Sequence, residues 1–106
     1  MITIEDFKKI ELKVARITQV VDHPDADKLY VITVDAGDKT KQIVAGIKPG
    51  YAKEELVGKQ IVIVDNLQPA VLRGVESQGM LLAAKDENGI VIISPAKEVR
   101  LGSTVK

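Results

Sequence analysis

The chain has 106 residues, of which 45% are hydrophobic and 28% are charged, and its 15 basic residues balance its 15 acidic ones. These values predict one soluble globular domain and argue against disorder, while the absence of cysteine excludes disulfide bonds and thiolate chemistry. No apolar run is long enough to cross a membrane, and the charged, amphipathic residues 1–10 do not resemble a signal peptide. We therefore expect a cytoplasmic protein with no membrane partner.

The first residues predict a short helix. Thr3 is placed to cap it, with Asp6 three residues later as in a capping box. Ile4, Phe7 and Ile10 recur at the spacing that puts them on one helical face.

A long strand is expected next, from Ile10 to Val21. Its apolar residues occupy one parity up to Val14 and the other parity from Ala15 onward. This switch predicts a β-bulge near Val14 and Ala15, which bends the strand and lets it turn the corner of a small barrel.

The remaining chain alternates between strand and turn patterns. Strands are predicted at residues 29–34, 42–47, 60–64, 79–84 and 90–93, helical turns at 51–57, and loops at 22–28 and 66–78. Three strands, a short helix and two strands is the order of the OB-fold, a five-stranded Greek-key barrel, although SH3-like barrels and sandwiches can look similar. We expect an all-β, five-stranded OB-fold barrel over residues 1–85, with an N-terminal helical turn and a C-terminal extension over residues 86–106.

The extension carries a strongly apolar run of four residues, Ile90, Val91, Ile92 and Ile93. It follows a barrel that five strands already complete, so it either caps the barrel or is buried in a partner chain. We predict a homodimer whose interface contains this run and Leu101.

Enzyme chemistry finds little support in the sequence. His23 is the only histidine, and together with Asp22, Asp25 and Asp27 it forms a cluster that could ligate a divalent metal. A polar loop whose carboxylates bind backbone N–H groups is the simpler interpretation. With no nucleophile motif and no glycine-rich phosphate loop, we predict no catalytic residue, no metal and no cofactor.

Binding is more plausible than catalysis, because OB-folds bind ligands through strands 2 and 3 and through two loops. Those loops are Asp22–Lys28 and Asn66–Gln78 here, and the second is long enough to suggest a function. The chain has only three aromatic residues, too few to stack successive bases, so a bound nucleic acid would be recognised by its shape and backbone.

Four segments of the chain resemble a known family in colinear order. They are ITIEDFKKIELKVARI (2–17), HPDADKLY (23–30), YAKEELVGK (51–59) and VDNLQPAVLRGVESQGMLLAA (64–84). They are similar to the structure-specific tRNA-binding domain, which occurs free-standing, in cytokine-like synthetase-associated proteins, and as an appendix or subunit of methionyl-tRNA synthetase. The opening ITIEDF looks closest to the methionyl-tRNA synthetase appendix.

The resemblance implies an OB-fold with a C-terminal extension that forms homodimers and binds the outer L-shape of tRNA with little sequence preference. It also implies that Ser77 and Met80 of the Ser-x-Gly-Met string contact RNA. The other candidate tRNA-binding residues are Lys28, Lys41, Asn66, Arg73 and Lys85.

The leading hypothesis is a non-catalytic, sequence-nonspecific tRNA-binding module whose partners are tRNA, a second copy and the catalytic domain or chain of a methionyl-tRNA synthetase. The strongly basic extensions of some family members are missing, which favours a helper role. The alternative is a dimerisation or protein-interaction module of a synthetase complex, and a metal-dependent enzyme ranks last.

Overall fold

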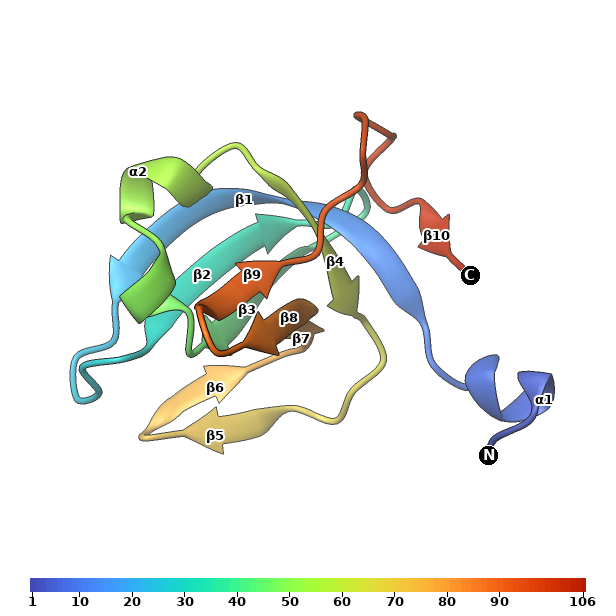
Figure 1. Cartoon of the computed structure of the whole chain (residues 1–106), viewed down its shortest axis with the longest axis horizontal. Helices are drawn as coiled ribbons and strands as arrows, with labels where there is room; N and C mark the ends of the chain where they lie inside the picture. Colours follow the sequence, from blue (N-terminus) through green and yellow to red (C-terminus); the bar gives the residue numbers. More distant parts are fainter.

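Strands rich in valine and isoleucine dominate the computed structural model, which describes all 106 residues (Figure 1). Six of them form one antiparallel sheet, in the order β3-β2-β1-β4-β7, with β10 beside β1. Their bounds are β1 (Leu12–Asp22), β2 (Tyr30–Asp35), β3 (Thr40–Ala45), β4 (Gln60–Val64), β7 (Met80–Leu81) and β10 (Thr104–Val105). The sheet curls because β1 arches across the molecule and pairs with β2 along its second half and with β4 along its first.

The wall of the barrel is completed between β3 and the segment before β7. Gln78 N donates to Gln42 O at 2.7 Å, and Gln42 N donates to Gln78 Oε1 at 2.8 Å. A short helix, α2 (Lys53–Leu56), lies between β3 and β4 after a 3₁₀ turn, η1 (Lys48–Gly50). This arrangement confirms the predicted OB-fold barrel.

The core fills the inside of the barrel with β-branched side chains. Ile17, Ile32, Ile43 and Ile61 are fully enclosed, and Leu56 of α2 plugs the same cluster. All five residues of β4 are buried, as their consecutive apolar character predicted.

The bulge of β1 lies at Thr18, where the register with β2 shifts between Ile17 and Gln19. The predicted position near Val14 and Ala15 is therefore wrong. Both of these residues are buried, on opposite faces of β1: Ala15 belongs to the main core, while Val14 pairs in register with Val62 of a small outer cluster. Two consecutive buried apolar residues produce the same sequence pattern as a bulge, although the strand is regular at this point.

The N-terminal helix α1 (Ile4–Phe7) has the predicted capping box. Asp6 N donates to Thr3 Oγ1 at 3.1 Å, and Thr3 N donates to Asp6 Oδ2 at 3.2 Å. None of its residues is fully buried, and the helix lies at the end of the molecule, where Phe7 packs against Leu12, Val62 and Val64 (Figure 1). No helix of the chain is both long and apolar enough to span a membrane.

Residues 66–78 do not form the unstructured loop expected from the sequence. They contain a hairpin of β5 (Ala70–Leu72) and β6 (Val75–Ser77), which projects from the barrel (Figure 1). The predicted strand 79–84 is also divided, because the chain leaves β4 at Leu82 and continues as β8 (Ala83–Asp86), which pairs with β9 (Gly89–Ile92).

The apolar run of the C-terminal extension is divided between the core and the surface. Ile92 belongs to the main core and Ile90 packs against it, so these two residues cap the barrel of their own chain. Val91 and Ile93 are exposed. The backbone of this segment is held by Tyr51, whose hydroxyl accepts a hydrogen bond from Ile92 N at 3.0 Å.

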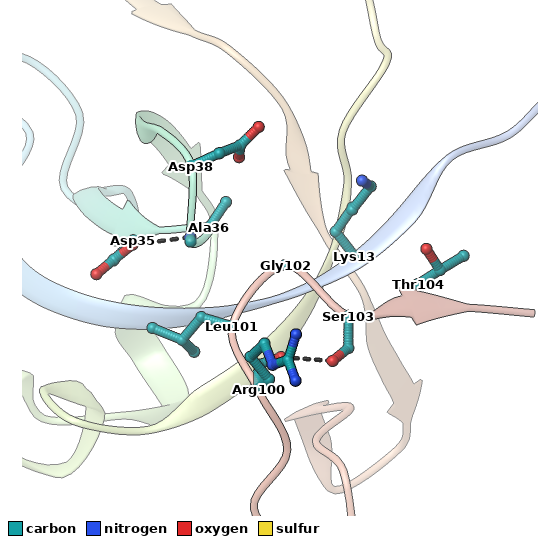
Figure 2. Close-up of a pocket in the computed structure, with 10 residues that line it drawn as sticks. Lys13, Asp35, Ala36, Asp38, Arg100, Leu101, Gly102, Ser103 and Thr104 are labelled. Carbon is teal, nitrogen blue, oxygen red and sulfur yellow. Dashed lines mark hydrogen bonds between the residues drawn. The ribbon is translucent and has the colours of Figure 1, made fainter.

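The last residues dock on the β2–β3 turn through two glycines (Figure 2). A Cβ atom at Gly102 would lie 2.8 Å from Ala36 O, and one at Gly37 would lie 2.6 Å from Leu101 O. Both glycines have positive φ angles, +87° and +93°, that other residues rarely adopt. Leu101 is partly buried in this contact.

Candidate functional site

The two loops predicted to bind a ligand lie next to each other. Arg73 Nη2, at the tip of the β5–β6 hairpin, donates to Asp25 O at 3.0 Å. Arg73 and residues 25–29 line a hollow of about 370 Å³, and Lys28 is one of these residues. The structure therefore brings Lys28 and Arg73 to the same site.

Arg73 occupies a strained backbone position. Its φ of +53° is the one positive φ of a residue other than glycine, and Gly74 follows with +88°. A two-residue hairpin turn of this kind favours Asn-Gly, and an arginine in the left-handed region costs on the order of 1 kcal/mol. Arg73 therefore occupies an exposed position at the hairpin tip at a cost in backbone strain.

Neither cation of this hollow forms an ion pair, although Asp25 and Asp27 line the same hollow. Arg73 bonds to a backbone carbonyl. Asp22, at the end of β1, is paired elsewhere, with Lys48 at 3.1 Å and Lys53 at 3.0 Å. Hydrogen bonds from Lys53 and then Lys48 lower the pKa of Asp22, so this carboxylate stays charged and paired.

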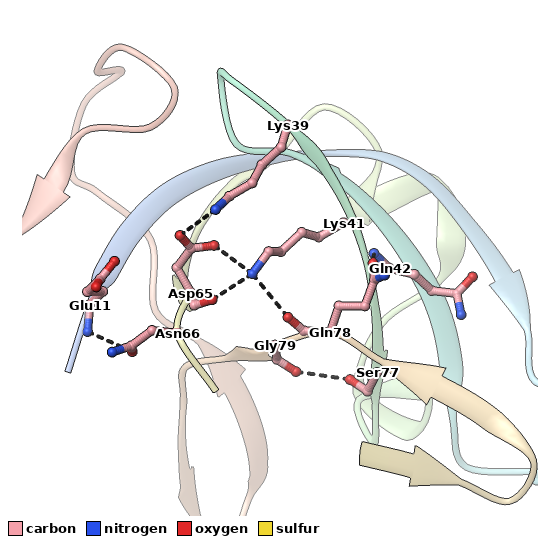
Figure 3. A network of polar contacts seen from close by, with 9 residues as sticks. All are labelled: Glu11, Lys39, Lys41, Gln42, Asp65, Asn66, Ser77, Gln78 and Gly79. Atoms are coloured by element: carbon pink, nitrogen blue, oxygen red, sulfur yellow. Dashed lines mark hydrogen bonds and ion pairs between the residues drawn. The ribbon is translucent and has the colours of Figure 1, made fainter. Parts of the chain in front are cut away.

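Lys41 holds the base of the hairpin, and its ammonium is engaged by groups of the chain itself (Figure 3). Its ammonium lies 2.8 Å from Asp65 Oδ1, 2.6 Å from Asp65 O and 3.2 Å from Gln78 O. The two contacts to carbonyl oxygens are hydrogen bonds, and the third is an ion pair with the buried carboxylate. The structure thus uses Lys41 to tie β3 to the segments at both ends of the β5–β6 hairpin.

Asp65 is a buried carboxylate between two lysines, because Lys39 also approaches its Oδ2 at 3.0 Å. Burial acts to raise the pKa of Asp65, but the hydrogen bonds from Lys41 and Lys39 outweigh it and hold the pKa below the ordinary value. The same contact raises the pKa of Lys39. The three side chains form one ionised cluster, which spacing in the sequence did not reveal.

Ser77 and Asn66 are also engaged within the chain. Ser77 is buried, and its Oγ donates to Gly79 O at 2.9 Å and accepts from Val44 N at 3.0 Å. The amide of Asn66 accepts from Glu11 N at 2.9 Å and donates to Lys9 O at 2.8 Å. Ser77 therefore joins β6 to β3, and Asn66 clips the N-terminal segment to the start of the loop.

Met80 and Lys85 have free side-chain surface. Met80 is half exposed and lines an apolar hollow of about 440 Å³ with Leu72 and Ile90 among its walls. Lys85 is exposed on β8 and forms no ion pair. Of the seven residues predicted to bind tRNA, four thus present their side chains to solvent unpaired by an acid: Lys28, Arg73, Met80 and Lys85.

A second hollow, of about 370 Å³ and without hydrophobic lining, lies on the outer side of β2 and β3. It is lined by Thr33, Thr40, Lys41, Gln42, Glu76 and Gln78. The sequence indicated strands 2 and 3 as a binding surface, but of these six residues it singled out only Lys41. No group of three or more histidine, aspartate and glutamate side chains is placed to hold a metal ion.

Known proteins are similar to this chain in both sequence and fold. A family profile described as a putative tRNA binding domain matches residues 12–104. The chain is 50% identical over 105 residues to the methionine–tRNA ligase of Thermococcus onnurineus strain NA1, covering 99% of this chain but only 14% of that ligase. A MetRS related protein from Pyrococcus horikoshii has a TM-score of 0.93 at 36% identity, covering 100% of this chain and 98% of that one. A CsaA chaperone protein from Picrophilus torridus has a TM-score of 0.93 at 31% identity, covering both chains fully.

Proposed function

The chain belongs to the putative tRNA-binding domain family, and we propose that it is a non-catalytic module that binds folded tRNA in the cytoplasm and assists a methionyl-tRNA synthetase. One observation carries the proposal: Lys28 and Arg73, two cations without acidic partners, share the hollow between the first loop and the strained hairpin. Asp25 and Asp27 also line this hollow, and a phosphate bound there would accept charge-assisted hydrogen bonds from the two cations.

Arg73 is suited to the main phosphate contact, because its guanidinium is planar, always charged and able to donate two parallel hydrogen bonds. Met80 supplies an adaptable apolar contact to sugar or base. Lys28 and Lys85 add longer-range attraction. Ser77 supports this surface from below by holding β6 against β3.

The module should recognise RNA by its shape, because neither of its tyrosines has a free ring face on which a base could stack. Tyr30 is buried and donates to Tyr51 O at 2.7 Å, while Tyr51 packs on the core and binds Ile92 N. Contacts to phosphates and sugars carry little sequence information. The module should therefore bind different tRNAs with similar affinity and discriminate against unstructured RNA.

Titration of several labelled tRNAs at three salt concentrations tests this function. Arg73→Ala should weaken binding to all of them alike, by about tenfold, and reduce the salt slope by about one unit. Lys97→Ala, an exposed and unpaired lysine of the C-terminal segment, is the matched control and should change neither. A folded Arg73→Ala variant with unchanged affinity and slope would refute the site.

We also propose a homodimer, which the exposed apolar residues favour. Ile93 bonds to Leu82, and Leu82 packs on the small outer cluster of Leu12, Val62 and Val64. The same cluster continues to Phe7 and Val105, where an apolar hollow of about 550 Å³ opens beside α1. A four-residue helix with no fully buried residue is marginal by itself. A second copy that covers this apolar surface, from Leu82 to Phe7 and Val105, would stabilise the helix.

Sedimentation of an Ile93→Asp variant tests the dimer. Ile93 is exposed, so its replacement should give a folded monomer, whereas Ile92→Asp should unfold the chain because Ile92 is in the core. A wild-type chain that remains monomeric at high micromolar concentration would overturn the proposal. A dimer whose tRNA affinity is insensitive to salt would favour the alternative function, a dimerisation module of a synthetase complex.

A further inference from the structure

We propose that His23 is a positioning residue, which locks the tip of the β5–β6 hairpin to the first loop and thereby holds Arg73 in place for tRNA. The proposal rests on the function proposed above. His23 follows β1 directly and is buried, although it is a polar residue in a loop that is otherwise mostly exposed.

Both ring nitrogens of His23 have defined partners. Asp25 N lies 2.9 Å from Nδ1, and Nε2 lies 2.9 Å from Leu72 O. A backbone N–H can only donate, so Nδ1 is the unprotonated nitrogen and accepts. The hydrogen of the neutral ring is then on Nε2, which donates to the Leu72 carbonyl.

These bonds close a ring of contacts with Arg73. Leu72 is the residue before Arg73, and Asp25, whose N–H binds His23, is also the residue whose carbonyl accepts from Arg73 at 3.0 Å. The loop and the hairpin tip are therefore joined twice, once through the imidazole and once through the guanidinium. When Arg73 gives up its bond to Asp25 O in order to bind a phosphate, the bond between His23 and Leu72 O still holds the hairpin tip to the loop.

The hairpin needs this lock because little else restrains its tip. All three residues of β5 are exposed, and an isolated two-stranded hairpin is marginally stable in water. The base is fixed to β3 through Ser77 and Gln42, but those contacts lie at the far end of β6. Without His23, only the β5–β6 pairing and the bond from Arg73 to Asp25 O remain to offset the strain of the left-handed Arg73 backbone.

Two substitutions separate the two bonds of the ring. In His23→Asn the amide oxygen stands near the position of Nδ1 and still accepts from Asp25 N, but the side chain is too short to reach Leu72. In His23→Gln the amide nitrogen reaches as far as Nε2 and still donates to Leu72 O, whereas the local bond is lost. Binding of a labelled tRNA should weaken about fivefold in His23→Asn and stay within about twofold in His23→Gln.

A double-mutant cycle shows whether His23 acts through Arg73. His23→Asn should cause no further loss in the Arg73→Ala background, because the residue that it positions is already gone. An equal loss in both backgrounds would mean that His23 supports the fold in general, and would overturn the proposal. Loss in Arg73→Ala without loss in His23→Asn would also overturn it, but would leave the tRNA site intact. No loss in Arg73→Ala would overturn both.

The tautomer of His23 provides a test that needs no variant, in case His23→Asn does not fold. Long-range ¹H–¹⁵N spectra of the wild-type chain distinguish the two neutral forms of its single histidine. We expect the form with hydrogen on Nε2. Hydrogen on Nδ1 would remove the bond to Leu72 O and refute the lock.

Discussion

Replacing Asp65 with asparagine should destabilise the domain more than any other change of a single charge. The carboxylate is almost fully buried, and it pairs with Lys41 at 2.8 Å and Lys39 at 3.0 Å. Removing one partner of a buried ion pair costs about 3–5 kcal/mol, because the remaining charge is left without compensation. Lys41 keeps its two backbone carbonyls and Lys39 is partly exposed, so we expect the lower end, about 3 kcal/mol.

Thermal unfolding followed by circular dichroism measures this effect. In a domain of this size 1 kcal/mol lowers Tm by about 4–8 °C, so Asp65→Asn should melt at least about 12 °C below the wild type. Asp22→Asn is the matched control, since that carboxylate also bridges two lysines but is half exposed, and its loss should hardly change Tm. A decrease of less than about 3 °C for Asp65→Asn would show that the cluster is not needed for stability.

The compensated variant separates buried charge from lost packing. Asp65→Leu combined with Lys41→Met replaces the pair by apolar side chains and should recover much of the stability that Asp65→Asn loses. Failure to recover would mean that the bonds from Lys41 to the Asp65 and Gln78 carbonyls hold the barrel together independently of the carboxylate.

Three further results are expected. The pKa of Asp65 is lowered on folding, so the stability that its carboxylate contributes is complete above the ordinary value of 3.8 and is lost as the pH falls through the folded value. The free energy of unfolding of Asp65→Asn should therefore lack this decrease at acid pH. Gly102→Ala should increase the hydrogen-exchange rates of the C-terminal segment, because its Cβ atom would collide with Ala36 O. Gly58→Ala has a similar φ but open space around it, so it should cost only backbone strain and leave those rates unchanged. Ser77→Ala leaves Val44 N–H unpaired in the interior and should lower the free energy of unfolding by about 1–3 kcal/mol, as measured with urea.

Features that depend on neighbours in the chain could be predicted from the sequence. The capping box of α1 and the strand β4 follow from spacings of a few residues, and the order of strands and helix was enough for the barrel. The β5–β6 hairpin was missed because its turn is Arg73-Gly74, which lacks the Asn-Gly or Asp-Gly signal of such turns.

The roles of the polar residues could not be predicted, because their partners are far away in sequence. Ser77 binds Val44, which is 33 residues distant, and Asn66 binds Glu11, which is 55 residues distant. A serine or asparagine in a loop resembles a ligand contact until the fold shows which backbone groups it satisfies. Lys41 shows the same ambiguity for a charged residue, since its ion pair with Asp65 exists only when β3 and the end of β4 are adjacent.

The division between supporting and exposed residues explains how a neutral domain can attract a polyanion. Carboxylates at two critical places are each bound by two lysines, Asp65 at the base of the hairpin and Asp22 beside the first loop. Each of these clusters retains one net positive charge instead of presenting a free acid to an approaching phosphate. In the hollow itself, Lys28 and Arg73 lie beside Asp25 and Asp27, and none of these four side chains forms an ion pair. The two lysine clusters are therefore positive although the sum over the chain is zero, and the support that they give the hairpin and the first loop lowers the entropy lost on binding.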